Sequence, residues 1–132
     1  MFESDFYTIE VDVEANLLRS KWHRPVSEAE MKAGGIKLYQ VLRDTRVERA
    51  VANAQALGVL TPPAKEWMST EFYELLSQTR LKRLARVLPA SVFHQIALES
   101  VITRAEALGK IRFNVKSFSD PAKAIAWAKA IE

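Results

Sequence analysis

Arg49-Ala50-Val51-Ala52-Asn53-Ala54 is the stretch that decides the fold, and Gln55-Ala56-Leu57-Gly58-Val59-Leu60-Thr61-Pro62-Pro63 follows it. Small apolar residues with little polar interruption are typical of a strand that is buried on both faces. The glycine and the prolines beyond it indicate a turn into a new helix. We therefore predict that residues 49–54 form a strand in the middle of a sheet.

Two strands are predicted upstream of it. Residues 7–13 alternate between apolar and polar side chains, which is typical of an edge strand with one wet face. In residues 17–22 the alternation places Leu18, Ser20 and Trp22 on one face. The turn Glu14-Ala15-Asn16 joins the two strands, so we expect a hairpin.

A capping box of Ser27 and Glu30 predicts the start of the first helix. Gly34 and Gly35 within this helix each cost about 1 kcal/mol relative to alanine. Either close approach of the helix to the sheet or local unwinding would explain them.

Thr61, followed by Pro62, predicts the N-cap of a second helix. Helical spacing predicts that its inward stripe is Met68, Phe72, Leu75 and Thr79, with Glu66, Glu71 and Glu74 outside it. Trp67 and Tyr73 lie off this stripe and are predicted to be half-covered surface aromatics.

The rest of the chain repeats the strand and helix pattern. Residues 84–88 form an apolar strand interrupted by Arg86, and a helix from about Ala90 to a Gly109 cap follows. The remaining predicted positions are a helix face of Leu98, Val101, Ile102, Ala105 and Leu108, a strand face of Ile111, Phe113 and Val115, and a last helix from Asp120 that buries Ala124, Ile125, Ala128 and Ile131. This order predicts one α/β domain over residues 1–132, with a five-stranded mixed sheet, an N-terminal hairpin and about four helices.

Composition narrows the class of protein. The 132 residues carry a net charge of +3 and no cysteine, which excludes disulfides and thiolate chemistry. Arg80, Lys82, Arg83 and Arg86 come close together, but no aromatic residues interleave with them, so we expect a solvated segment rather than a nucleic-acid surface. The acidic N-terminus lacks a secretory pattern and no apolar run reaches membrane-spanning length, so we expect a soluble, cytoplasmic protein.

The chain resembles the SpoIIAA-like members of the STAS superfamily over nearly its whole length. The features shared are a hairpin ending in Trp22, a Val26-Ser27 helix entry, the strand Lys82-Arg83-Leu84-Ala85-Arg86-Val87, and Phe118-Ser119-Asp120-Pro121-Ala122-Lys123-Ala124-Ile125-Ala126-Trp127. The resemblance implies a four-turn βα superhelix used for protein interaction, for anion or nucleotide sensing, or for holding an apolar ligand.

One motif of that family is missing. The resemblance implies a phosphorylated Ser or Thr, preceded by Asp, after the central strand, but this chain has Asn53-Ala54-Gln55-Ala56-Leu57-Gly58 there. Thr61 is the nearest hydroxyl before the helix, and we expect it to act as the N-cap.

Ligands of open α/β sheets bind beyond the carboxyl ends of the strands. We predict that this edge gathers Trp22, His23, Asn53, Gln55, Thr61, Arg86, Ser91 and Asn114. Arg86 within a buried strand needs either a neighbouring carboxylate or an exit to water.

No catalytic constellation is recognisable. There is no P-loop, no G-x-G-x-x-G and no G-x-S-x-G elbow, and the only histidines, His23 and His94, lie in unrelated segments, so we expect no enzyme, no cofactor and no metal. Our first hypothesis is a protein-interaction module that uses Trp67, Tyr73 and residues 80–86, with self-association as one form of it. The second is a carrier or sensor with an apolar or anionic small molecule between sheet and helices. An enzyme of unrecognised mechanism is the third.

Overall fold

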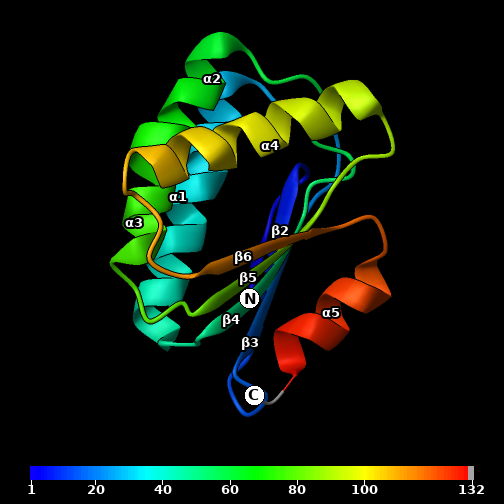
Figure 1. The fold of residues 1–132 in the computed structure, drawn as a ribbon. Coiled ribbons are helices and arrows are strands. Elements are labelled where there is room, and N and C mark those ends of the chain that lie inside the picture. The colour runs from blue at the N-terminus through cyan, green and yellow to red at the C-terminus, as the bar shows by residue number, and fades with distance from the viewer. Residues whose placement is uncertain (131–132) are drawn as a thin grey trace.

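The computed structural model describes residues 1–130 and has an α/β fold in which a mixed sheet lies between two helical layers of unequal size (Figure 1). Helices α1 to α4 cover one face of the sheet, and α5 alone lies on the other. The strands are β1 (Phe2–Glu3), β2 (Tyr7–Asp12), β3 (Leu17–Trp22), β4 (Arg49–Asn53), β5 (Arg83–Val87) and β6 (Asn114–Phe118). The helices are α1 (Glu28–Thr45), α2 (Pro62–Trp67), the π-helical η1 (Met68–Phe72), α3 (Tyr73–Ser77), α4 (Val92–Ala107) and α5 (Pro121–Lys129).

The prediction of a strand inside the sheet at residues 49–54 is confirmed, although β4 ends one residue earlier, at Asn53. The strands follow the order β1-β2-β3-β4-β5-β6, so β4 lies inside the sheet between β3 and β5. Ala50 packs into the larger core under α1 to α4, whereas Val51 packs under α5. Successive side chains of β4 point to opposite faces of the sheet, and both faces of the strand are therefore covered by helices.

Strand directions determine which loops share an edge. β1, β2 and β3 are antiparallel, which confirms the hairpin, and β3 to β6 are parallel. Leu18 pairs with Ala50 and Val51 pairs with Ala85. The carboxyl ends of β3 to β6 therefore meet at one edge of the sheet.

The predicted sheet was wrong in two places. The short strand β1 adds a sixth strand, because Phe2 pairs with Ile9 on the outer side of β2. The last strand begins at Asn114, three residues later than predicted, because Arg83 pairs with Asn114. Phe113 is buried in the larger core just before the strand, since its ring lies 6.5 Å from that of Tyr73.

Helix α1 begins as predicted. The side chain of Ser27 accepts a hydrogen bond from the Glu30 amide at 3.1 Å, and the Glu30 carboxylate accepts one from the Ser27 amide at 3.0 Å. Gly34 and Gly35 remain helical, so close approach, not unwinding, explains them. A Cβ on Gly34 would lie 2.5 Å from Trp22 of β3.

The Glu30 carboxylate also predicts a pH dependence. Its hydrogen bonds from Arg24, at 2.8 Å, and from the Ser27 amide lower its pKa from 4.5 to about 2. Because the pKa is lower in the folded state, this carboxylate stabilises the fold above about pH 4.5 and loses that effect as the pH falls toward 2. We expect Glu30→Gln to lower the free energy of unfolding at pH 7 but to have little effect near pH 2, as measured by denaturant titration. Glu106→Gln, at an exposed position of α4, is the control and should change the free energy of unfolding by less than about 0.5 kcal/mol. An equal loss for Glu30→Gln at every pH would contradict the assignment.

The helix after Thr61 departs from the predicted phase. The Thr61 side chain accepts a hydrogen bond from the Ala64 amide at 3.2 Å, as expected for an N-cap. The π-helical turn η1 then inserts one extra residue, so the faces rotate beyond it. Tyr73 and Leu76 are buried, while the predicted Leu75 and Thr79 are only half-buried.

Helix α4 ends as predicted and carries one wrong inward position. Gly109 follows the helix with a φ of +70°, a conformation that glycine adopts without steric cost. Leu108, predicted to face the core, is instead the C-cap residue of α4 and is 44% exposed.

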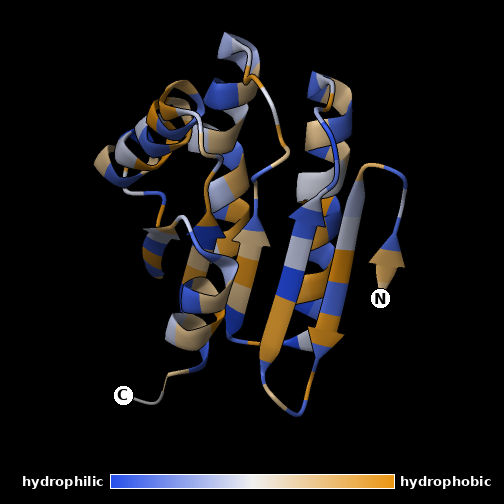
Figure 2. Cartoon of the chain, turned by 90° about the vertical axis from the view of Figure 1, so that its right-hand side faces the viewer, coloured by the Kyte–Doolittle hydropathy of each residue, from blue (hydrophilic) through white to orange (hydrophobic). Residues whose placement is uncertain are grey.

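The face that carries α5 is only partly covered. Ala124 and Ala128 are fully buried and pack on Val51, Ala85 and Val87. Figure 2 shows that α5 lies over the later strands and leaves β2 and most of β3 open, although Leu17 at the start of β3 is buried in the cluster under α5. Ile131, predicted to be buried, lies outside the described residues. Within residues 1–130, no helix has the length and hydropathy needed to cross a membrane.

Candidate functional site

Several of the predicted site residues meet at one edge of the sheet, where they divide between its two faces. Trp22, Asn53 and Arg86 lie at or near the carboxyl ends of β3, β4 and β5. Asn114 is a correction, because it opens β6 and therefore lies at the opposite edge.

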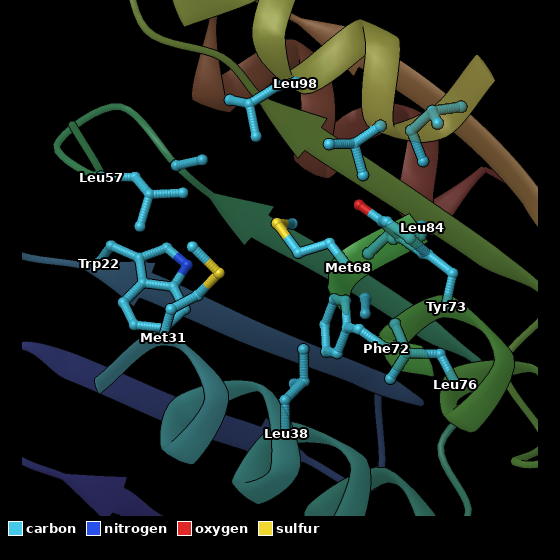
Figure 3. Packing of buried hydrophobic residues seen from close by; sticks show 14 of the residues in the cluster. Trp22, Met31, Leu38, Leu57, Met68, Phe72, Tyr73, Leu76, Leu84 and Leu98 are labelled. Atoms are coloured by element: carbon cyan, nitrogen blue, oxygen red, sulfur yellow. The ribbon is translucent and has the colours of Figure 1, made fainter. Parts of the chain in front are cut away.

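Four of the predicted residues line one interior cavity between the sheet and the helical layer. Its volume is about 50 Å³, and it is lined by Trp22, Trp67, Tyr73 and Arg86 together with apolar side chains such as Leu57, Met68, Leu84 and Leu98. Figure 3 shows Trp22 and Met31 toward one end of this cluster and Tyr73 and Leu76 toward the other. Arg86 is the only charged residue in the lining.

Trp22 is a core residue rather than an exposed ligand platform. It is 8% exposed, and its ring stacks on Tyr7 with 3.9 Å between centroids. Gly34 of α1 lies against the outer edge of the indole. The missing Cβ of Gly34 therefore gives the tryptophan its place in the core.

Tyr73 is buried, contrary to the prediction of a half-covered surface aromatic. It is 2% exposed because the π-helical turn η1 rotates it toward the sheet. Burial raises the pKa of its hydroxyl, and the nearby Arg86 guanidinium lowers it less strongly. The phenol therefore stays neutral and able to donate a hydrogen bond at neutral pH.

Trp67 is half-buried, as predicted, and it separates the cavity from the outside. Its ring stacks on Phe72 at 5.6 Å. A Cβ on Gly35 would lie 2.9 Å from the Trp67 ring, so this glycine also permits close packing. On its outer side Trp67 shares a surface groove with Ile36 and Leu75.

Arg86 is the most constrained polar side chain of the cavity. Its Nη1 donates to the carbonyl oxygen of Leu98 at 3.0 Å, and its Nη2 donates to the carboxylate of Glu99 and to Oγ of Ser117. Only 5% of the Arg86 side chain is exposed, against 54% for Glu99. Glu99 is thus the neighbouring carboxylate that was one of the two alternatives predicted for Arg86, and it reaches the guanidinium from the surface of α4. Among the described residues, Nε of Arg86 has no hydrogen-bond partner.

His23 and Asn53 face the other side of the sheet. Both line a groove of about 210 Å³ beside α5, with Arg19 and Lys21 of β3 on its wall. The His23 ring is hydrogen-bonded to the Thr8 hydroxyl. Oδ1 of Asn53 accepts a hydrogen bond from the Gln55 amide at 2.9 Å. Asn53 and Gln55 therefore also stabilise the loop after β4.

Thr61 and Ser91 stand at helix starts. Thr61 is engaged as the N-cap of α2. Ser91 occupies the N-cap position of α4 without a capping hydrogen bond from its side chain. Neither residue lines the cavity or the groove beside α5.

Two surface features escaped the sequence analysis. At the amino ends of the strands a wide groove is lined by Arg49, Lys82, Arg83 and Arg112, with Glu48 paired to Lys82 at 3.1 Å. Strand register places residues from three segments in it, of which the sequence analysis had grouped only Lys82 and Arg83. On α4, the apolar residues Val92, Phe93 and Ile96 are exposed and lie close together. The sequence did contain a clue, because these three apolar residues were not part of the apolar face predicted for that helix.

Within residues 1–130, no three His, Asp or Glu side chains are grouped so as to hold a metal ion. Comparisons of the chain with family models, with curated proteins and with solved structures found no match.

Proposed function

We propose that this protein is a non-enzymatic binding module of STAS type that recognises a protein partner through the first turns of α4. The observation that carries the proposal is the exposure of three neighbouring apolar side chains there. Val92 is 66% exposed, Phe93 is 86% exposed and Ile96 is 63% exposed. We call these three residues the α4 patch.

Exposed apolar side chains that gather in one place distinguish an interaction surface from ordinary surface. Val92 and Ile96 are one helical turn apart and Phe93 lies beside them, so the three form a continuous surface. Phe93 adds a large rigid ring, the type of side chain that dominates binding energy at interfaces. The family resemblance supports the same function.

The other features put forward for partner binding contribute less. Tyr73, Arg83 and Arg86 are buried, and Arg83 donates to the carbonyls of Trp127 and Ala130 at the end of α5. Arg80 and Lys82 stay exposed at the amino edge of the sheet, away from the α4 patch. Trp67 is half-exposed and belongs to a different groove.

We expect Phe93→Ser to weaken partner binding at least tenfold, because truncation of a central aromatic typically costs about 2 kcal/mol or more of binding free energy. A partner would be captured from the native host by crosslinking and purified. Calorimetry would then measure its affinity for the unchanged protein and for the Phe93→Ser variant. Sedimentation of the protein alone would reveal a second copy as the partner.

Leu108→Ser is the matched control, because Leu108 is an exposed apolar residue at the other end of α4. This variant should keep the affinity of the unchanged protein, and both variants should keep its unfolding midpoint. Equal affinity of the Phe93→Ser protein for the same partner would rule out the α4 patch.

A small-molecule sensor or carrier is the second candidate. The cavity favours it, since four predicted site residues line one apolar space that contains a buried cation. The volume of about 50 Å³ is far below the several hundred Å³ of pockets for large ligands, so any ligand must be small.

A further inference from the structure

The interior cavity contains one charged group, the guanidinium of Arg86. We propose that this cavity binds a short-chain monocarboxylate, whose carboxylate lies on the Nε side of Arg86 and whose alkyl group lies among the apolar lining. This inference gives a ligand class to the second candidate function, and it is independent of the α4 patch.

The first argument is the free donor. Nε of Arg86 is fully buried and has no hydrogen-bond partner among residues 1–130, although Nη1 and Nη2 are both engaged. An unsatisfied buried donor on a charged group is costly, and such groups in native proteins are normally paired. An acceptor inside the cavity would satisfy it.

The second argument is the geometry of the guanidinium. Nε and Nη2 form one edge that matches the two oxygens of a carboxylate with parallel hydrogen bonds. Nη2 is held by Glu99, whose side chain is 54% exposed and can turn into water. An incoming carboxylate can therefore take the Nη2 bond from Glu99 and add the Nε bond, so that the buried cation keeps an anionic partner.

The third argument is size and polarity. A water-sized group needs about 10–15 Å³ of such a volume, so about 50 Å³ holds three to five of them. Acetate has four non-hydrogen atoms and propionate has five. Apart from Arg86, the hydroxyls of Tyr7 and Tyr73 and the indole N–H groups of Trp22 and Trp67, the lining is apolar, which suits a methyl or ethyl group and disfavours a second charge.

The chain offers a direct readout, because two of its three methionines, Met31 and Met68, line the cavity, whereas Met1 is 84% exposed. The full-length protein would be labelled with ¹³C at the methionine methyls and titrated with sodium acetate, propionate or hexanoate at constant ionic strength. We expect saturable shifts of the Met31 and Met68 signals with acetate or propionate, no shift of Met1, and no saturation with hexanoate.

Two variants test the site itself. Arg86→Met should weaken the binding of propionate at least tenfold, whereas Arg19→Met, which removes an exposed arginine, should leave it unchanged. Leu98→Phe fills the cavity while keeping Arg86, so it should also abolish the saturable shifts. This variant tests the site even if the Arg86→Met protein does not fold.

Several results would overturn the proposal. They are shifts that do not saturate or that include Met1 equally, an equal response to neutral acetamide, and unchanged affinity in the Leu98→Phe protein. A crystal structure grown in acetate that places only water at Nε would do so as well. None of these results bears on Phe93, so failure of the carboxylate site and failure of partner binding are distinguishable.

Discussion

Arg86→Ala is expected to lower the free energy of unfolding by about 3 kcal/mol. The substitution removes a long buried side chain beside an existing cavity, and truncations of that size to alanine cost about 2–5 kcal/mol. It also leaves the carbonyl of Leu98 without the guanidinium. Release of Glu99 into water offsets part of this loss, since that side chain is half exposed. Urea unfolding monitored by tryptophan fluorescence would measure the difference.

The controls separate packing from charge. Arg86→Met keeps most of the buried stem and should cost less than Arg86→Ala, because replacing buried ionic groups with apolar ones of similar volume is often nearly neutral. Arg19→Ala removes an arginine whose pairing with Glu10 is exposed, so it should change stability by less than about 0.5 kcal/mol. If Arg86→Ala were as mild as Arg19→Ala, the side chain would not stabilise the interior.

Local signals in the sequence predicted the elements that depend on neighbours along the chain. The capping box of Ser27 and Glu30, the N-cap Thr61 and the glycine after α4 are such cases, and each was confirmed. The middle position of β4 was also predictable, because a strand covered on both faces must be apolar along its whole length.

The phase of the second helix was not predictable in this way. A π-helical turn adds one residue without any change in composition, so a strict helical count assigns Leu75 to the core and leaves Tyr73 outside. Asn114 shows a related limit. Its position depends on pairing with Arg83, a contact between segments about thirty residues apart.

The candidate site shows the same division. The rule for parallel sheets brought Trp22, Asn53 and Arg86 to one edge, but it does not state which face each side chain takes. The partner of Arg86 was predicted only as a nearby carboxylate, because Glu99 reaches it from α4, a separate element. The cavity depends on how helices pack across the sheet, which no single segment encodes.

Gly34→Ala is expected to lower the free energy of unfolding by about 1–2 kcal/mol, although alanine is the better helix former. On helix propensity alone the change would stabilise the protein by about 1 kcal/mol. The new Cβ, however, would lie 2.5 Å from the Trp22 ring, and that ring cannot retreat because it stacks on Tyr7. Overpacking of this kind typically costs about 1–3 kcal/mol. Thermal and urea unfolding would measure the net change and its sign.

The sign of the change in the free energy of unfolding distinguishes a steric clash from helix propensity. Two further variants separate these two effects. Ala33→Gly, at the exposed neighbouring position, should cost about 1 kcal/mol through propensity alone. In a Trp22→Leu background the clash is removed, so Gly34→Ala should stabilise that protein instead of destabilising it. A double-mutant cycle would then give a non-zero coupling energy, whereas independent positions would give a coupling near zero, because the two positions are in contact. If Gly34→Ala destabilised both backgrounds equally, the glycine would be required for a reason other than the approach of α1 to Trp22.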